Sequence, residues 1–266
     1  MKVLVLGAEG MLGHEVAKHL QGFDLIAPTR EQYSAFDSLD QFSLTCADVI
    51  INCIGAIPQK GYDPKEMMRL NAHFPKFLDD NTDAMIIQIA TDCVFSGRAG
   101  SYDEDYSRDA TDPYGQSKIF GEIIGSNWLH LRCSIIGAEQ RGKKSLFEWV
   151  RNQPYNATIY GYANHYWNGL TTRAFGQMVK GILDQEFFMV GTQHIVPANQ
   201  VSKYELLKLI AMRTGRKDLN ILPKIVEPVN RTLDTIHPAL NKELWKIAGY
   251  STIPTIEKMV EQMELD

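Results

Sequence analysis

The segment KVLVLGAEGMLGHEVAKHL, residues 2–20, determines the fold class that this sequence predicts. Its apolar run at residues 2–6 is typical of a buried β-strand, and the glycine-rich stretch that follows ends that strand. Apolar residues then recur at helical spacing over residues 11–22, and Gly22 is a suitable helix terminator. A strand, a tight glycine turn and a helix in this order are the first unit of a nucleotide-binding α/β sheet.

Three glycines in the spacing GxxGxxG join this strand to this helix. Gly7 permits the tight turn, Gly10 lets a pyrophosphate approach the backbone N–H groups, and Gly13 lets the helix pack closely on the strand. A glycine triplet by itself is weak evidence, but its place between a strand and an amphipathic helix makes it specific. We therefore expect a dinucleotide cofactor to contact Gly7, Gly10, Met11, Leu12 and Gly13.

Strands and helices continue to alternate through the first half of the chain. Strands are expected at residues 23–28, 48–55, 84–92 and 128–137, and helices at 37–45, 65–81 and 113–126. Pro75 should kink or interrupt the second of these helices. Because every expected strand is apolar throughout, the sheet should be parallel and covered by helices on both faces. The predicted fold class is α/β, a Rossmann-type doubly wound parallel sheet with a smaller C-terminal substrate-binding lobe.

The alternation weakens after residue 137. The remaining helices are expected at residues 144–152, 172–184, 202–213 and 254–264, separated by loops rich in Pro, Gly and Asn. We predict an NAD(P)-binding Rossmann domain over residues 1–137, to which elements around residues 170–200 return. Residues 138–266 should mainly form the substrate-binding lobe.

The composition argues against several classes of protein. With 27 Lys and Arg against 32 Asp and Glu in 266 residues, the formal net charge is −5, so the chain lacks the basic surface typical of a nucleic-acid binder. Its longest apolar stretches are far shorter than the roughly 20 residues of a membrane span, and its N-terminal region lacks a secretory cleavage site. Four widely spaced cysteines without CxxC, and histidines without ligand spacing, predict a cytoplasmic protein with neither a disulfide framework nor a metal site.

The end of the second expected strand bears on which dinucleotide binds. It reads IAPTR and contains Arg30 but no acidic residue. A carboxylate there accepts a hydrogen bond from the 2′-hydroxyl of NAD, whereas arginine suits the 2′-phosphate of NADP. We predict NADP(H) as the preferred cofactor and NAD(H) as the alternative, with a merely solvated Arg30 as the competing interpretation. Asp37 is the next polar candidate, for the adenine amino group. The backbone that ends the third expected strand should pass the cofactor at Cys53, Ile54 and Gly55.

Tyr114 and Lys118 lie four residues apart in DPYGQSK and therefore on one face of the expected helix. A phenol with a pKa of about 10 is a poor acid–base group at neutral pH, and a nearby ammonium group lowers that pKa. Most Tyr–Lys pairs of this spacing occur by chance on solvated helix faces, but this pair follows a strand that ends near Thr91. The glycine turn, the strand-end hydroxyl and YxxxK, in that order, predict a nicotinamide-dependent catalytic site.

With these motifs the sequence resembles the extended short-chain dehydrogenase/reductases, and among them the dTDP-4-dehydrorhamnose reductase family. The family pattern STDYVFDG is matched by ATDCVFSG at residues 90–97, and further matches are LRCSIIG (131–137), GLTT (169–172) and VNRTLDT (229–235). The resemblance implies NAD(P)H-dependent reduction of a keto group, at C4, on a nucleotide-linked deoxysugar of polysaccharide biosynthesis.

The resemblance also implies roles for three side chains. Thr91 would hydrogen-bond the sugar carbonyl, and Tyr114 would deliver the proton. Lys118 would bind the nicotinamide ribose and lower the pKa of Tyr114. Since the cofactor supplies the hydride, the protein would contribute orientation and charge.

Substrate contacts are less determined by the sequence. Cys93 replaces the aromatic residue of the family motif, so this wall of the sugar pocket differs. Arg231 matches a family arginine and is a candidate for contact with the diphosphate or the sugar, with a surface ion pair as the alternative. If the resemblance extends to the lobe, His165 and Trp167 lie near the substrate entrance, with core packing as the alternative. The expected partner is a nucleotide sugar, and homodimer formation is left open.

Two other functions remain open. GDP-fucose synthases, which both epimerise and reduce, have a cysteine at the offset of Cys93 from Thr91, and such a cysteine with His165 would relay protons. The favoured explanation of Cys93 is nevertheless a small buried side chain with a packing role. The second is a non-catalytic NADP-binding regulatory subunit, similar to the beta subunit of methionine adenosyltransferase, which has no need of Tyr114 with Lys118. A dehydratase is disfavoured because Cys93 replaces the glutamate that eliminates water.

Overall fold

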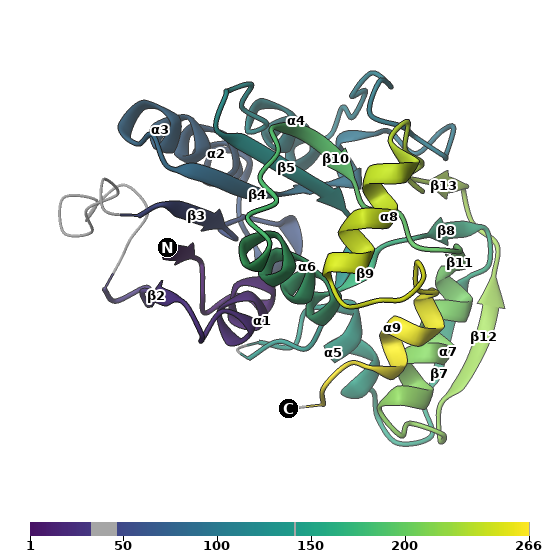
Figure 1. The fold of residues 1–266 in the computed structure, drawn as a ribbon. Coiled ribbons are helices and arrows are strands. Elements are labelled where there is room, and N and C mark those ends of the chain that lie inside the picture. The colour runs from purple at the N-terminus through teal and green to yellow at the C-terminus, as the bar shows by residue number, and fades with distance from the viewer. Residues whose placement is uncertain (33–46, 141, 266) are drawn as a thin grey trace.

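The computed structural model describes residues 1–32, 47–140 and 142–265. A six-stranded sheet forms its central layer, with the order β10-β5-β4-β3-β1-β2 and every neighbouring pair parallel (Figure 1). Its strands are β1 (Lys2–Leu6), β2 (Asp24–Ile26), β3 (Val49–Asn52), β4 (Met85–Thr91), β5 (Trp128–Cys133) and β10 (Gly191–His194). The predicted α/β fold with a parallel sheet is confirmed. After β1 the chain adds β2 on one side of this strand and then β3 on its other side, so the strand order reverses between β1 and β3. Ligands of such sheets bind at this point, beyond the carboxyl ends of the strands.

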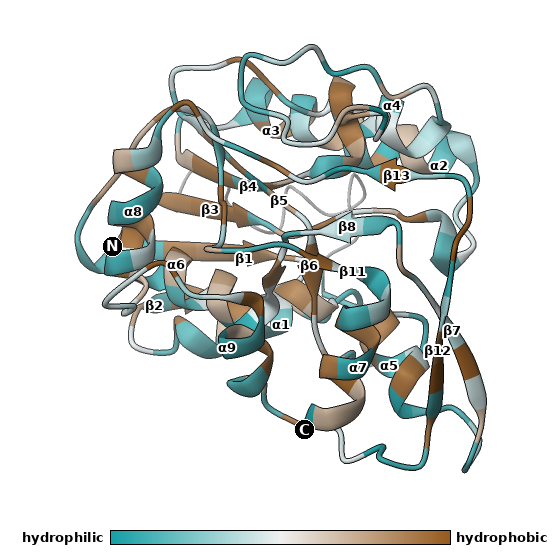
Figure 2. Cartoon of the chain, turned by 90° about the vertical axis from the view of Figure 1, so that its right-hand side faces the viewer, coloured by the Kyte–Doolittle hydropathy of each residue, from teal (hydrophilic) through white to brown (hydrophobic). Residues whose placement is uncertain are grey.

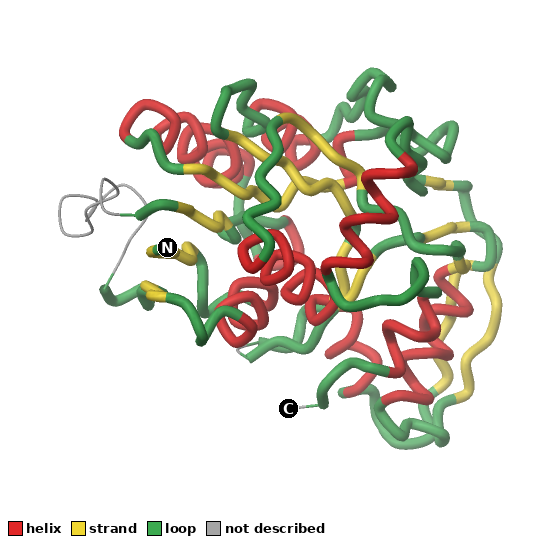
Figure 3. The backbone as a smooth tube through the Cα atoms, viewed as in Figure 1, coloured by secondary structure: helices red, strands yellow, loops and turns green. Residues whose placement is uncertain are grey.

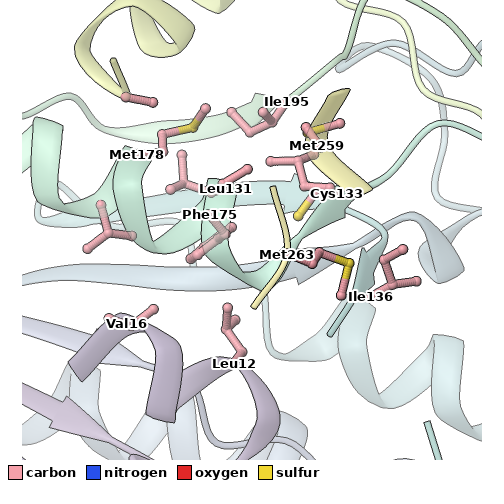
Figure 4. Packing of buried hydrophobic residues seen from close by; sticks show 14 of the residues in the cluster. Leu12, Val16, Leu131, Cys133, Ile136, Phe175, Met178, Ile195, Met259 and Met263 are labelled. Carbon is pink, nitrogen blue, oxygen red and sulfur yellow. The ribbon is translucent and has the colours of Figure 1, made fainter. Parts of the chain in front are cut away.

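Alternate side chains of each strand enter two separate hydrophobic layers. Val3 and Val5 belong to the larger core, whereas Leu4 and Leu6 belong to the smaller core on the opposite face. In Figure 4, side chains of α1 and α6 meet Leu131 of β5 in the larger core. The helices that contribute to the larger core are α1 (Met11–His19), α6 (Thr172–Asp184) and α8 (Pro238–Ile247). Those on the opposite side are α2 (Pro64–Met68), α3 (Phe74–Asn81) and α4 (Pro113–Phe120) (Figure 1). The central strands are thus enclosed on both faces, whereas the edge strand β2 is partly exposed. Figure 2 shows hydrophobic strands between helices with hydrophilic outer surfaces.

The helix expected at residues 65–81 is interrupted where Pro75 predicted a break. A π-helical segment, Arg69–His73, separates α2 from α3, and Pro75 is the second residue of α3. Proline has no N–H to donate to the carbonyl group four residues earlier, which is that of Asn71, and its ring crowds that carbonyl. The wider turn accommodates this conflict. It also lies beside the candidate site, because Asn71 contacts α4.

The C-terminal lobe consists of short strands and helices that lie beside the carboxyl ends of the central strands (Figure 3). In its three-stranded sheet, β8 (His165–Trp167) pairs with β11 (Val201–Ser202) on one side and β13 (Val229–Asn230) on the other. Two-stranded sheets are formed by β7 (Thr158–Tyr162) with β12 (Asn220–Lys224) and by β6 (Ile135–Ile136) with β9 (Leu170–Thr171). The helices are α5 (Leu146–Arg151), α7 (Lys203–Arg213) and α9 (Ile256–Glu261). Among the described residues, single-turn 3₁₀ helices are formed by Pro58–Lys60 and Asp92–Val94.

Some expectations of the sequence differ from this arrangement or fall outside it. The helix α8 was not expected from the sequence, and it begins at Pro238 without a side-chain cap from His237. The strand β10 pairs with β5, so residues after the first lobe strands do join the central sheet. The domain boundary near residue 137 remains a prediction.

The helix expected at 37–45, with Asp37, lies outside the described residues. Within the described ranges, no helix has the length and apolar character to cross a membrane.

Candidate active site

The glycine turn between β1 and α1 leaves little room for a Cβ atom at Gly7 and none at Gly13. Gly7 has a φ of +79°, and a Cβ atom there would lie 3.0 Å from the Ile54 backbone nitrogen and the Cys53 carbonyl carbon. A Cβ atom on Gly13 would lie only 2.1 Å from the Gly7 carbonyl oxygen. Gly10 is the N-cap of α1 and offers no side-chain cap to the first amides, including those of Met11 and Leu12. A helix N-terminus of this kind fits the pyrophosphate of a dinucleotide.

The end of β2 has an acidic neighbour that the local sequence does not reveal. The backbone N–H of Arg30 donates to Oε2 of Glu9 at 2.8 Å, so the glycine turn brings a carboxylate to this strand end. The exposed guanidinium of Arg30 donates to the Tyr62 hydroxyl at 3.3 Å. Glu9 is visible in GAEG, but only the turn geometry places it beside Arg30.

The first turn of α4 is packed closely against the segment after β4. Asp112 caps α4 by accepting a hydrogen bond from the N–H of Gly115 at 3.0 Å. A Cβ atom on Gly115 would lie 2.6 Å from the carbonyl oxygen of Cys93, so a larger residue would push the helix away. The phenol of Tyr114 consequently lies next to Thr91, with whose hydroxyl it interacts. The structure therefore brings together the two hydroxyl groups that the sequence predicted as catalytic.

The environment of Tyr114 corrects one expectation. Burial raises the pKa of Tyr114, and the neighbouring Cys93 and Asp92 raise it further, while the Thr91 hydroxyl acts in the opposite direction. The expected lowering of this pKa by Lys118 is not observed; burial is the largest influence, and it raises the pKa. A phenol with a raised pKa remains protonated at neutral pH and is a proton donor.

Lys118 belongs to α4, and its buried side chain lies next to the start of the segment that follows β3. A Cβ atom on Gly55 would lie 3.5 Å from Nζ of Lys118 and 3.6 Å from Oδ1 of Asn71. Burial lowers the pKa of Lys118, whereas the carboxylate of Glu122, one turn later, raises it. Lys118 therefore faces the strand end where Cys53, Ile54 and Gly55 were expected to pass the cofactor.

Asn71 connects this strand end to α4 and was missed in the sequence. Its Oδ1 accepts from the N–H of Ala56 at 2.8 Å, and its Nδ2 donates to the Ala56 carbonyl at 2.8 Å and to Ser117 Oγ at 2.9 Å. A Cβ atom on Gly121 would lie 1.8 Å from the Asn71 carbonyl oxygen, so α4 also approaches the π-helical turn directly. The available signal was Pro75, since an irregular turn inside a helix often marks a functional site.

A buried network supports the far end of α4. Glu122 accepts from Nε of Arg132 at 3.1 Å and from Nη2 at 2.5 Å, and both side chains are about 5% exposed or less. Nη1 of Arg132 lies 2.7 Å from Nε2 of His194 on β10. These three residues link the YxxxK helix to the edge of the sheet, and none was singled out from the sequence.

Cys93 has the geometry of a protonated thiol. Its N–H donates to Thr91 Oγ1 at 3.2 Å, and its Sγ donates to Oδ1 of Asp92 at 3.7 Å. Burial, followed by the Asp92 carboxylate, raises the pKa of Cys93 to about 12. His165 donates from Nε2 to the carbonyl of Glu227 at 2.7 Å. Neither group is arranged as an obvious proton relay.

The remaining predicted substrate residues lie in or beside the sheet of the lobe. Trp167 on β8 is 3% exposed, and its Nε1 donates to Ser134 Oγ at 2.8 Å. Arg231, directly after β13, donates from Nε to the carbonyl of Phe95 at 2.8 Å. The charge of Arg231 acts on Asp92, the residue after Thr91. Arg231 thus lies beside the end of β4 that carries Thr91, whereas Trp167 is buried in the lobe.

The comparisons with known proteins identify a family. Residues 1–263 match the family model described as the RmlD substrate binding domain. The chain is 30% identical over 151 residues to the spore coat polysaccharide biosynthesis protein SpsK of Bacillus subtilis (strain 168). That match covers 48% of this chain and 53% of SpsK, so the matched part is about half of the relative's length.

Solved structures share the fold at low sequence identity. The dTDP-4-dehydrorhamnose reductase of Bacillus anthracis str. Ames, in complex with NADP, has a TM-score of 0.80 at 18% identity, with 99% of both chains covered. MoeE5 in complex with UDP-glucuronic acid and NAD has a TM-score of 0.73 at 16% identity, covering 99% of this chain and 97% of that one. RMD from Pseudomonas aeruginosa, complexed with NADPH, has a TM-score of 0.70 at 16% identity, and the match covers 98% of this chain and 96% of that one. These likenesses extend over the whole fold.

Proposed function

Because the chain belongs to the RmlD substrate binding domain family, we propose that it is an NADPH-dependent reductase of a keto group on a nucleotide-activated sugar. In this proposal the keto group is at C4 of a deoxysugar, and the reaction belongs to polysaccharide biosynthesis. The dTDP-4-dehydrorhamnose reductase and the SpsK protein among its relatives support this assignment. A cytoplasmic location and a homodimer remain predictions.

The observation that carries the proposal is the meeting of Thr91, Tyr114 and Lys118 at the carboxyl ends of β3 and β4. Thr91 and Tyr114 present two hydroxyl groups to one place, and Lys118 lies beside Gly55 at the next strand end. The glycine turn, which has no room for a Cβ atom on Gly13, fits a dinucleotide whose nicotinamide ring would supply the hydride.

Each side chain then has a task in the reduction. Thr91 orients the carbonyl oxygen of the sugar by donating a hydrogen bond, and Tyr114 donates the proton that this oxygen requires. The raised pKa of Tyr114, due to burial, keeps the phenol protonated before the reaction. Lys118 supplies an ammonium group that orients the ribose of the cofactor.

The cofactor preference rests on Arg30. Its exposed guanidinium at the end of β2 suits the 2′-phosphate of NADP. Glu9, which accepts from the Arg30 backbone, is a carboxylate of the kind that accepts from the 2′-hydroxyl of NAD. We therefore keep NADP(H) as the preferred cofactor and NAD(H) as the alternative.

The competing functions are less well supported by the geometry. An epimerase–reductase needs an accessible thiolate, but the pKa of Cys93 is raised to about 12 by burial and by Asp92. It also needs a free imidazole, whereas Nε2 of His165 is bonded to the Glu227 carbonyl. A purely regulatory subunit leaves the arrangement of Tyr114 beside Thr91 without a purpose.

The test is NADPH consumption with a panel of substrates. The 4-keto-6-deoxyhexoses linked to dTDP, UDP and GDP are each mixed with the protein, and NADPH absorbance is followed. We expect consumption with at least one of them, together with formation of the corresponding 4-hydroxy sugar. A protein that binds NADPH but consumes none with the entire panel contradicts the proposal.

A further inference from the structure

The buried side chain of Lys118 has no direct partner for its charge. Among the residues that the structure describes, none accepts a hydrogen bond from its Nζ, and no carboxylate lies within 4.0 Å of it. Only 9% of the residue is exposed, and the transfer of an ammonium group from water into a protein is costly without a counter-charge. A carboxylate farther away must therefore support the charge of Lys118.

Three ionisable side chains from three parts of the chain act electrostatically on Lys118. They are Glu122 beyond the end of α4, Cys93 after β4 and Cys53 after β3. Burial raises the pKa of both thiols to about 12, so these groups are uncharged at neutral pH. Glu122 is thus the source of the negative charge that acts on Lys118, and it raises the pKa that burial lowers.

The carboxylate of Glu122 is fixed by side chains from two other segments. Its Oε1 accepts from Nε of Arg132 at 3.1 Å, and its Oε2 accepts from Nη2 of Arg132 and, at 2.8 Å, from Nη1 of Arg108. The N–H of Glu122 donates to the Ile119 carbonyl at 3.3 Å, so the chain continues the turn of α4 at this point. Residues four apart on such a turn are neighbours, which places the carboxylate on the side of Lys118.

Positive charge exceeds negative charge around Glu122. Arg132, Arg108 and Lys118 are cations, and the imidazole of His130 is neutral because burial lowers its pKa. Arginine does not lose its proton in proteins, whereas a buried lysine does so readily. If a neutral residue replaced Glu122, Lys118 would be surrounded by cations alone, and it would be the group that loses a proton.

We infer that Glu122 is a positioning residue that keeps Lys118 charged for the ribose of the cofactor. The ammonium group lies beside Gly55, at the strand end where the cofactor is expected to pass. An ammonium group donates three charge-assisted hydrogen bonds, which hydroxyl groups of a ribose can accept. The ribose as ligand rests on the proposed function, whereas the effect of Glu122 on Lys118 does not.

The first test measures the titration of Lys118 in the cofactor-free protein. Protein with carbon-13 at the lysine Cε atoms is followed by NMR from about pH 6 to about pH 11, and the Lys118 signal is identified by its absence from Lys118→Met. In Glu122→Gln we expect the midpoint to fall by about one pH unit, the scale of one lost charged neighbour. Glu122→Asp keeps the charge and should remain closer to the unchanged protein.

A buried glutamate elsewhere provides a matched control. Glu148 on α5 is 5% exposed, and its Oε1 lies 3.5 Å from Nη1 of Arg151. It therefore shares the burial and the arginine neighbour of Glu122, but it does not act on Lys118. Glu148→Gln should leave the titration of Lys118 unchanged.

Arg108→Met tests the same charge balance in the opposite direction. The side chain of Arg108 is 35% exposed, so its removal should be tolerated even if Glu122→Gln does not fold. Loss of this cation should raise the midpoint of Lys118, because a like charge disfavours the protonated form.

The pH dependence of NADPH binding measures the consequence for the cofactor. Binding that needs the ammonium group is retained below the pKa of Lys118 and is lost as the pH rises through it. In Glu122→Gln the affinity should therefore fall about tenfold, the scale of one charged hydrogen bond, at a lower pH than in the unchanged protein. In Lys118→Met, adding Glu122→Gln should not move the pH dependence further.

The outcomes separate this inference from the proposed function. An unchanged midpoint in folded Glu122→Gln overturns it, as does a midpoint that fails to rise in Arg108→Met, or an NADPH profile that does not follow the midpoint. A loss of unfolding free energy in Glu122→Gln without any shift would assign Glu122 only to the attachment of α4 to β5. If the midpoint and the NADPH profile shift but no keto sugar consumes NADPH, the reductase proposal fails and the role of Glu122 stands.

Discussion

The glycine turn at residues 7–13 and the lobe surface beside Thr91 are built from different kinds of contact. In the turn, backbone meets backbone, and a Cβ atom on Gly13 would lie 2.1 Å from the Gly7 carbonyl oxygen. In the lobe, polar groups connect segments far apart in sequence. The N–H of Ser101 donates to Thr232 Oγ1 at 3.0 Å, and Asn168 pairs with the backbone of Leu233.

This difference indicates how each region should respond to substitution. The turn depends on steric exclusion, so one added methyl group affects a single rigid unit. The lobe depends on many separate hydrogen bonds, and each contributes only about 0.5–1.5 kcal/mol net. Cofactor binding should therefore be lost abruptly, whereas substrate recognition should be lost gradually.

Gly13→Ala should have the largest effect on the turn. The new methyl group would overlap the Gly7 carbonyl, and overpacking of this kind costs about 3 kcal/mol of unfolding free energy, with loss of NADPH binding. Urea unfolding and NADPH titration measure both. Gly22→Ala is the control, because nothing lies within 4 Å of the added atom, and it should leave both quantities nearly unchanged. A Gly13→Ala variant with normal stability and normal NADPH affinity would refute the steric account.

Tyr114→Phe should separate chemistry from binding. Removal of the proton donor should lower kcat about 100-fold, equivalent to about 2.7 kcal/mol of activation free energy, while the Kd of NADPH stays the same. Single-turnover hydride transfer to the keto sugar found in the substrate panel measures this. The exposed Tyr155→Phe serves as the matched control. An unchanged rate of hydride transfer in Tyr114→Phe would remove Tyr114 from its role.

Asn168→Ala should weaken the lobe and leave the turn intact. The buried Asn168 donates to the Leu233 carbonyl at 2.7 Å and accepts from its N–H at 2.9 Å, so both groups lose their partner. We expect a loss of about 2 kcal/mol in unfolding free energy and a higher KM for the sugar. NADPH affinity should be preserved. Asn220→Ala removes an exposed contact to Thr158 Oγ1 and should change little. Equal losses of NADPH and substrate affinity in Asn168→Ala would contradict the separation of the two regions.

Arg30→Ala should act on the cofactor side alone. Because the guanidinium is exposed, we expect a loss of about 1.5 kcal/mol in NADPH binding, near the lower limit for charge-assisted hydrogen bonds, and unchanged NADH binding. Fluorescence titrations with both cofactors measure the difference. Equal dissociation constants for NADPH and NADH in the unchanged protein would argue against selection by Arg30.

Cys93→Ser should have the smallest effect. With a pKa raised to about 12 by burial and by Asp92, the thiol is protonated at neutral pH, and a hydroxyl can replace it as a donor. Reductase activity should fall less than about threefold, under about 0.7 kcal/mol. In D₂O, the carbons beside the reduced position should gain no enzyme-dependent deuterium. Deuterium there that disappears in Cys93→Ser would favour the epimerase–reductase.

Several local features could be recognised without the fold. The glycine spacing, the apolar strands and the Pro75 break each depend on a few neighbouring residues, and the structure contains them, except that β2 is partly exposed rather than buried. Tyr114 and Lys118 share a helix because their spacing matches one helical turn. The predicted lowering of the pKa of Tyr114 by Lys118 was wrong. Burial and Asp92 raise this pKa, and both depend on packing that the spacing does not encode.

The sequence by itself determined the parallel α/β sheet, the glycine turn and the catalytic motifs, because backbone sterics and side-chain periodicity act over short stretches. Only the tertiary structure decided which charges meet: Glu9 beside Arg30, and Lys203 with Arg231 beside Asp92. The position of Asn71 between Ala56 and Ser117 also depends on the packing of separate elements. Electrostatic and hydrogen-bonding partners act through space, so they are defined only when the fold brings distant segments within a few ångströms of one another.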